Sequence, residues 1–322
     1  MRKWIQAGAT ALALGISTVS AAAGWPDRPL TLVVPFGPGS SPDQMARVIT
    51  EKASSILGQA IVVQNRPGAS GNLGTNVIAK SKPDGYTFGV SITGPMVNNT
   101  LIYKDLPYDP KKDLVPLTLA VHQPNILVVP ASSPIKTLPA LLDAMRDPKT
   151  QFNFPSTGTG TVAHLAVELL LQRVGGKAVH VPYASSPAAL SALLSGDAQF
   201  AALPPVAVMP MVNDGRLRAL AVVFNESTDM FPNIPTLAEQ GVKDIEGSGW
   251  IGFVAPAGIP DDIRKTLTDA LIKAIHDPEV EKRLKAQYML PVGNQPEEFA
   301  RYMDEELKRW GPIIKRLNLS VN

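Results

Sequence analysis

The alternation of strand-like and helix-like segments constrains the fold of this chain more than any other feature of its sequence. The apolar run Leu30–Phe36 is followed by a helical pattern over residues 42–57, with apolar residues on one face and Gly58 as its stop. An apolar run at 125–130 likewise precedes a helical stretch at 137–146. Strands that alternate with helices form parallel sheets covered by helices on both faces. The sequence therefore predicts an α/β protein whose sheets are mainly parallel.

The segment from residue 260 onward has a different pattern. It predicts three helices that begin near Pro260, Pro278 and Pro296, with no strands between them. Two strand-rich halves and a helical tail indicate two α/β domains, because domains typically hold about 100–200 residues. We expect the tail to pack on the first domain. The expected ranges are 24–124 for the first segment of domain 1, 125–235 for domain 2, and 236–322 for the return segment and C-terminal helices of domain 1.

Residues 1–23 have the order of a secretory signal. Arg2 and Lys3 are positive, Ala7–Val19 is apolar, and small residues offer cleavage after Ala22 or Ala23. The apolar core is short and is interrupted by polar residues, whereas a membrane span needs about 20 mostly apolar residues. We therefore expect export and cleavage rather than an anchor.

Composition narrows the class of protein further. The chain has no cysteine, so it forms no disulfide and offers no thiol nucleophile, and an exported protein of this kind fits a bacterial periplasm. The formal net charge is +2, and positive and negative residues are interspersed. A nucleic-acid partner is disfavoured because no stripe of Lys and Arg is present.

The loop at 37–41, Gly-Pro-Gly-Ser-Ser, lies between the first predicted strand and helix. We predict Ser41 as the N-cap, Pro42 as the first helical residue and Gln44 as the partner in a capping box. A helix N-terminus exposes unpaired N–H groups, and glycine lets a ligand approach them, so an anion needs no Lys or Arg there. The alternative is an ordinary strand-to-helix turn, which recurs in every doubly wound domain.

The loop at 156–161, Ser-Thr-Gly-Thr-Gly-Thr, repeats this arrangement in the second half of the chain. Four hydroxyl groups join the backbone donors there, and Thr161 is the predicted cap. Two anion-binding loops of this kind, one in each domain, indicate a ligand that both domains contact. Neither loop carries GxxxxGK[ST], and Gly158 and Gly160 lack the third glycine of GxGxxG, so a carboxylate is favoured over a nucleotide.

Catalysis has one candidate pair. His164, in the first turn of the helix after the second loop, could act as a base for Ser156 as a nucleophile, or could brace the loop. The sequence has no GxSxG elbow and no HExxH pair. Asp43 either complements the dipole of the first helix or contacts the ligand, directly or through water. We expect no enzyme activity, no cofactor and no metal.

Seven stretches, in order, resemble the Bug family, the substrate-binding proteins of tripartite tricarboxylate transporters. The resemblance extends from about Trp25 to Leu319 and includes WPDRPLTLVVPFGPGSSPD at 25–43 and STGTGTVAHLAVELL at 156–170. It implies a two-domain periplasmic binding protein of the type II, Venus flytrap kind. Such a protein closes on a small carboxylate, partly through bridging waters. The resemblance also implies integral-membrane permease subunits as partners, and we expect a monomer.

By resemblance, the two loops, the strand end at 91–93 and the segment at Pro182-Tyr183 line the cleft. The expected ligand-binding residues are Phe36, Gly37, Pro38, Gly39, Ser40, Ser41, Asp43, Ser91, Thr93, Ser156, Thr157, Gly158, Thr159, Gly160, Thr161, His164, Tyr183 and Leu203.

The chain departs from the family pattern at two places. The first loop is usually Pro-Ala-Gly-Gly in the family, and many members have Phe-Asp where this chain has Ala202-Leu203. That Asp can receive an amino group, whereas Leu203 cannot. Our hypothesis is a carboxylate with an apolar or aromatic far end, and not an amino acid. The alternatives are a ligand sensor that contacts a membrane signalling partner and, less favoured, an exported hydrolase that uses Ser156 and His164.

Overall fold

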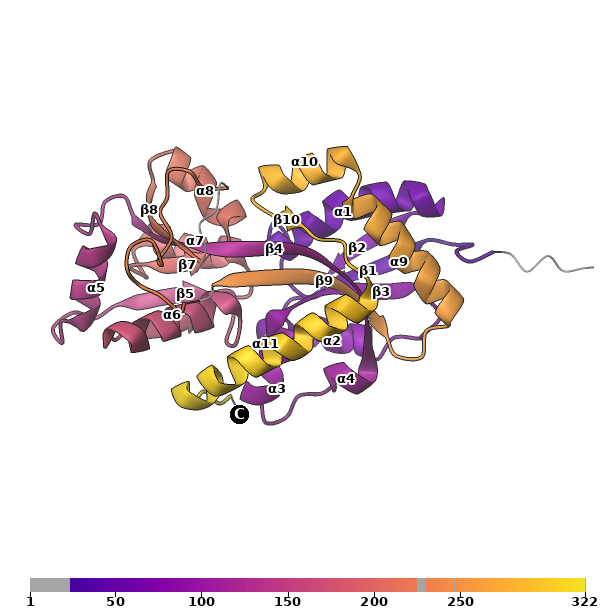
Figure 1. Cartoon of the computed structure of the whole chain (residues 1–322), viewed down its shortest axis with the longest axis horizontal. Helices are drawn as coiled ribbons and strands as arrows, with labels where there is room; N and C mark the ends of the chain where they lie inside the picture. The colour runs from indigo at the N-terminus through magenta and orange to yellow at the C-terminus, as the bar shows by residue number, and fades with distance from the viewer. Residues whose placement is uncertain (1–23, 225–229, 246, 322) are drawn as a thin grey trace, which may run out of the picture.

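The computed structural model describes residues 24–224, 230–245 and 247–321 (Figure 1). The expected signal peptide at 1–23 lies outside the described residues. Within the described part of the chain, no helix has the length and apolar character needed to cross a bilayer. The chain forms two lobes, and long strands run from one lobe to the other (Figure 1).

The first lobe is built on a mixed sheet with strand order β10-β4-β9-β3-β1-β2. β2 and β3 run parallel to β1, as expected, but β9 is antiparallel to both of its neighbours, β3 and β4. The expectation of a mainly parallel sheet is therefore wrong here, because β9 carries the chain back from the second lobe. The strands are β1 (Leu30–Val34), β2 (Ile61–Asn65), β3 (Thr87–Ile92), β4 (Leu114–Pro130), β9 (Ser248–Pro256) and β10 (Leu290–Pro291).

Helices cover both faces of this sheet. On one face, α1 (Ser41–Leu57), α9 (Asp261–Ile275) and α10 (Pro278–Ala286) enclose a core that includes Leu32 and Val90. On the other face, α2 (Asn72–Ala79) and α11 (Pro296–Leu317) enclose Val33 and Val254. Neighbouring residues of β1 thus enter opposite cores, as the alternation of side chains along a strand requires. Shorter elements are η1 (Ala69–Gly71), the π-helix η2 (Gly94–Asn98), α3 (Asn99–Ile102) and α4 (Pro110–Asp113).

The three tail helices begin where the sequence predicts, with Pro260 as the N-cap of α9 and Pro278 and Pro296 as the first residues of α10 and α11. The expected lack of strands between them is wrong, because β10 pairs with β4 at Val121 and His122. The tail packs on the first lobe, and the far end of α11 also reaches the second lobe. There Trp310 packs against Val162 and Leu165 of α6 (Val162–Val174).

The second lobe alternates strands and helices around its own cores. β7 and β8 pair antiparallel with the distal part of β4, and β5 and β6 form a separate parallel pair. Leu237 and Ile245, which we expected in the return segment, pack in this lobe against residues such as Phe154. The elements are α5 (Leu138–Arg146), β5 (Asn153–Ser156), α6 (Val162–Val174), β6 (Val179–Pro182), α7 (Ser186–Ser195), β7 (Ala201–Leu203), α8 (Pro205–Asn213) and β8 (Leu217–Val223).

The long strand β4 belongs to both lobes. Leu114–Pro124 pairs with β9, whereas Asn125–Pro130 pairs with β8. β4 and β9 therefore run side by side across the junction, as Figure 1 shows. Gln123 and Asn125, on either side of this junction in β4, line the pocket that lies between the lobes.

Candidate functional site

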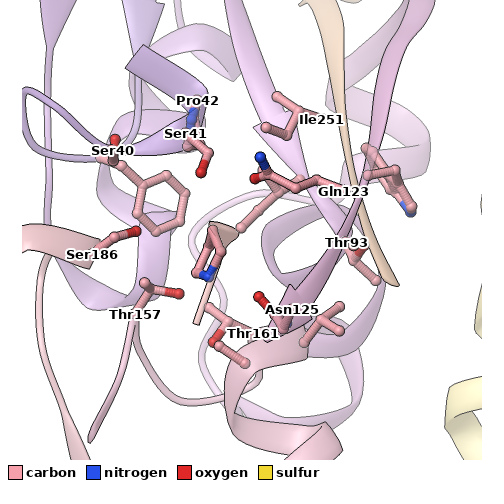
Figure 2. Close-up of a pocket in the computed structure, with 17 residues that line it drawn as sticks. Ser40, Ser41, Pro42, Thr93, Gln123, Asn125, Thr157, Thr161, Ser186 and Ile251 are labelled. Carbon is pink, nitrogen blue, oxygen red and sulfur yellow. The ribbon is translucent and has the colours of Figure 1, made fainter. Parts of the chain in front are cut away.

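A pocket with a volume of about 70 Å³ lies between the lobes, and residues of the two connecting strands β4 and β9 line part of it. Figure 2 shows Ser40 and Ser41 on one side of it and Thr157 and Thr161 on the other. No described residue that lines the pocket carries a formal charge. The lining residues are Phe36, Ser40, Ser41, Pro42, Ile92, Thr93, Gln123, Asn125, Thr157, Thr161, Val162, Ala163, Ser186, Pro204, Gly249, Trp250 and Ile251.

The N-terminus of α1, which follows the first loop, lies at this pocket. The N-cap is Ser40, one residue earlier than predicted, and no side chain caps the helix. Ser40 Oγ instead donates to the carbonyl of Gly37 at 2.7 Å, and the Gln44 amide donates to the carbonyl of Gly39 at 3.0 Å. The predicted capping box is therefore wrong, because both side chains donate back into the loop. The positive end of α1 is left without a side-chain acceptor at the pocket.

The second loop delivers the N-terminus of α6 in the same way. Thr161 is the N-cap, as predicted, and again no side chain caps the helix. Its Oγ1 donates to the carbonyl of Gly158 at 2.7 Å, which matches the Ser40–Gly37 bond of the first loop. Two helix N-termini, one from each lobe, thus face one space. This geometry suits an anion that accepts hydrogen bonds from backbone donors.

Asp43 braces the first loop rather than the pocket. Its carboxylate accepts hydrogen bonds from Gly39 N at 2.9 Å, Arg47 Nε at 3.0 Å and Asn65 Nδ2 at 3.0 Å. Burial alone would raise the pKa of Asp43, but the hydrogen bonds from Arg47, Gly39 and Asn65 together lower it below its ordinary value. Asp43 does not line the pocket. Its structural contribution is to hold the loop that carries Ser40 and Ser41.

Ser156 and His164 do not pair with each other. Ser156 Oγ lies 2.6 Å from Nε2 of His180 and accepts a hydrogen bond from Gly158 N at 3.0 Å. His164 Nδ1 accepts from Gly160 N at 3.1 Å, so its proton is on Nε2, which faces Glu168 Oε1 at 3.6 Å. The Ser156 side chain is fully buried. The nucleophile–base pair considered from the sequence is therefore wrong, since each group is occupied in shaping the loop.

Two buried hydroxyl groups at the pocket have no protein partner. Ser41 Oγ and Thr93 Oγ1 make no hydrogen bond, although the two residues are only 2% and 1% exposed. Both residues line the pocket. A buried polar group without a partner is costly, so a ligand oxygen that accepts from these hydroxyls relieves that cost.

Other predicted residues lie around this pocket or behind it. Thr157, Gly158, Thr159 and Tyr183 line an adjoining hollow of about 290 Å³, and Phe36 and Thr157 border both spaces. The remaining predicted residues lie outside the first pocket. In the first loop, Gly37 packs against Ser185, Gly39 packs against Pro187, and Pro38 is exposed. Elsewhere, Gly160 contacts Asn99, Ser91 Oγ lies 3.4 Å from Thr75 Oγ1, and Leu203 is fully buried in a core with Ile126.

The residues at the base of the pocket were not predicted from the sequence. Gln123 and Asn125 of β4 line it, as do Trp250 and Ile251 of β9. Gln123 and Asn125 are polar residues inside an otherwise apolar stretch of the sequence, and this contrast is a signal that could have identified them. Pro204, rather than the preceding Leu203, faces the pocket from the second lobe. Among the described residues, no group of three or more His, Asp or Glu side chains could hold a metal ion.

Comparison with known proteins shows to which family the chain belongs. Residues 45–319 match the model of the tripartite tricarboxylate transporter family receptor. Protein BugT of Bordetella pertussis (strain Tohama I) is 33% identical over 304 residues, which cover 94% of this chain and 93% of BugT.

Two solved structures share the fold over nearly their whole lengths. R. palustris Rpa4515 with adipate has a TM-score of 0.88 and 31% identity, and the match covers 92% of this chain and 99% of that one. MatC from Rhodopseudomonas palustris with bound malate has a TM-score of 0.83 and 29% identity, and the match covers 90% of this chain and 100% of that one. The chain therefore belongs to the tripartite tricarboxylate transporter receptor family and has its two-domain, periplasmic-binding-protein fold.

Proposed function

We propose that the chain is a periplasmic receptor that binds a small carboxylate without an amino group and delivers it to the permease subunits of a tripartite tricarboxylate transporter. The observation that carries the proposal is the pocket between the lobes, where two uncapped helix N-termini meet in a lining without formal charge. Helix N-termini bind anions through backbone N–H groups and the helix dipole. Adipate and malate, the ligands in the two neighbouring structures, are both carboxylates.

The proposed ligand lacks an ammonium group because the pocket offers no acid to receive one. Asp43, the acid nearest in sequence to the lining residues, is already bonded to Gly39, Arg47 and Asn65. An ammonium group in this space would lose its hydration without gaining a counter-charge, which is strongly unfavourable. The Leu203 side chain packs in the core of the second lobe, so the lack of an acid in the pocket, and not Leu203, disfavours an ammonium group.

Apolar side chains favour a ligand with an apolar middle or far end. Phe36, Ile92, Val162 and Ile251 line the pocket together with its polar groups. Burying apolar ligand surface against them adds about 25 cal/mol per Å². A carboxylate with a short hydrocarbon chain or ring uses both features of the pocket.

The proposed receptor has no catalytic role. Ser156, the candidate nucleophile, is enclosed by its bonds to His180 and Gly158 and is not exposed to a substrate. Domain closure around the ligand is the proposed mechanism, with β4 and β9 as the connecting strands.

Calorimetric titration of the mature chain, from Gly24 onward, tests the proposal. The panel contains adipate, malate, benzoate, glutamate and aspartate. Adipate against its 2-amino derivative, 2-aminoadipate, is the matched comparison, because the two differ only by the ammonium group. We expect the unsubstituted acid to bind at least tenfold more tightly. Tighter binding of the amino acids would overturn the exclusion of ammonium groups, and no binding across the panel would overturn the carboxylate assignment for these compounds.

A further inference from the structure

The two lobes contact each other directly beside the ligand pocket. Nδ2 of Asn98, in the first lobe, donates a hydrogen bond to the carbonyl oxygen of Gly160, in the second lobe, at 2.9 Å. Asn98 is fully buried at this contact. The bond joins the end of η2 to the loop that caps α6, so it exists only when the lobes are together.

Two glycines of the second loop make this approach possible. A Cβ atom on Gly160 would lie 2.3 Å from Oδ1 of Asn99, and one on Gly158 would lie 2.6 Å from Oγ of Ser70. Asn99 and Ser70 belong to the first lobe. Both glycines also have positive φ, +82° and +126°, which other residues rarely adopt. A side chain at Gly160 would therefore have to displace the Asn99 side chain, and one at Gly158 would also clash with the backbone of Ser70, whose Cα atom would lie 2.9 Å away.

The segment that carries Asn98 begins at the ligand pocket. Thr93, whose hydroxyl has no partner, immediately precedes the π-helix η2, and Asn98 is the last residue of η2. π-helical turns are rare and are frequent at functional sites. Tyr108 braces the turn, because its hydroxyl lies 2.9 Å from the carbonyl oxygen of Pro95 and 3.1 Å from Oδ1 of Asn72. One short, braced turn thus connects a group that lines the pocket with a group that contacts the opposite lobe.

We propose that Asn98 is a closure latch: a ligand bound in the pocket at Thr93 favours the hydrogen bond from Asn98 to Gly160 and therefore favours the closed arrangement of the lobes. This inference rests on the proposed carboxylate-binding function. A ligand oxygen that accepts from Thr93 Oγ1 holds the start of η2 in the position from which Asn98 reaches Gly160. Asn98 does not line the pocket, so it acts as a positioning residue. Its effect is on the balance between open and closed lobes.

Distance measurement between spin labels tests the latch. The chain has no cysteine, so Ser191→Cys in α7 and Lys282→Cys in α10, both exposed, label one position in each lobe. Pulsed electron paramagnetic resonance then gives the distribution of distances with and without saturating adipate. Asn98→Ala removes the donor, and Asn98→Asp keeps the size of the side chain without the Nδ2 donor. Gly160→Ala adds the clash with Asn99.

A matched control separates closure from backbone strain. Gly196 has a φ of +90°, close to that of Gly160, but an added Cβ would meet nothing within 4 Å. We expect Gly196→Ala to keep the parent distribution and Gly160→Ala to lose the closed population. Asn98→Ala should raise the ratio of open to closed lobes about fivefold, the effect of one neutral hydrogen bond.

The two proposals fail in different ways. Failure of adipate to bind the parent, with the Asn98 variants still more open, would contradict adipate as a ligand but leave the latch in place. Identical distributions for the parent, Asn98→Ala and Asn98→Asp, with and without adipate, would overturn the latch. Thr93→Val tests the coupling: adipate should close the parent more than it closes this variant, and equal closure would overturn the link to Thr93.

Discussion

His164 stacks on His180 behind the second loop, with ring centroids 3.8 Å apart and planes inclined by 20°. Both rings also stabilise the loop, because His164 accepts from Gly160 N and His180 pairs with Ser156 Oγ. Burial, together with the neighbouring His164 ring, lowers the pKa of His180 to about 3. A protonated ring would be unfavourable in this stack, so the folded state holds His180 neutral.

The free energy of unfolding should fall as pH decreases from about 6.5 toward 3. In this window the unfolded chain binds a proton at His180 that the folded chain does not, so stability is present above pH 6.5 and is lost on acidification. His122, whose pKa is lowered to about 4 by burial and by Arg309, acts with the same sign. Thermal unfolding of the parent and of His180→Gln, measured from pH 7.5 to 4, checks the contribution. The variant should show a shallower dependence, and equal slopes would contradict the assignment.

Ser156→Ala should destabilise the fold without affecting any hydrolytic rate. The substitution leaves His180 Nε2 and Gly158 N without their partner, at a cost of about 1–3 kcal/mol. Ser195→Ala is the control, because that hydroxyl lies near the exposed end of α7 and bonds to Asp197. Urea unfolding gives the free energies. An ester-hydrolysis rate in the parent that disappears in Ser156→Ala would instead support the hydrolase interpretation.

Asp43→Asn should lower the free energy of unfolding, measured by urea unfolding, although Asp43 does not line the pocket. An amide cannot accept as strongly from Gly39 N, Arg47 and Asn65, so the loop that presents Ser40 loosens. We expect a loss of about 1–3 kcal/mol in the free energy of unfolding. Asp269→Asn is the control, since it removes an exposed i,i+4 pair with Lys265 and should cost at most about 0.5 kcal/mol. Equal effects of the two changes on the free energy of unfolding would contradict the bracing role of Asp43.

Ser41→Ala and Thr93→Val should each lower ligand affinity and preserve stability. Their hydroxyls have no protein partner, so removing them breaks no bond in the free protein. A hydrogen bond to a carboxylate contributes about 1.5–3 kcal/mol, which predicts at least a tenfold loss of affinity for adipate. Calorimetric titration measures the affinity, and Ser191→Ala, on an exposed face of α7, is the control. Full affinity in both variants would contradict the placement of the ligand.

The strongly periodic parts of the chain were predictable from the sequence. The strand at Leu30, the helix that ends before Gly58 and the tail helices that begin at Pro278 and Pro296 all lie where local pattern and end signals put them. Both glycine-containing loops were also identified, because strand, small-residue loop and helix follow one another within about 15 residues. Short-range signals of this kind depend on the backbone preferences of a few neighbours.

The hydrogen-bond partners of the loops were not predictable in the same way. Ser40 and Gln44 match a capping sequence, yet both donate back to carbonyls of the loop. Ser156 has His164 eight positions away, yet it pairs with His180, 24 positions away on β6. Parallel pairing of β5 with β6 brings these two residues together, and sequence spacing contains no record of that register.

The sequence by itself determined the class of fold, the family and the two places where an anion can meet a helix N-terminus, because these depend on local pattern and on long matching stretches. Only the tertiary structure decided which face of each loop meets the other lobe. In the folded chain Gln123 and Trp250 lie at the base of the pocket, and the Leu203 side chain packs in a core of the second lobe. The physical reason is that β4 and β9 cross between the lobes, so residues more than 100 positions apart in the sequence line one pocket. Tertiary packing, rather than local propensity, brings these residues together.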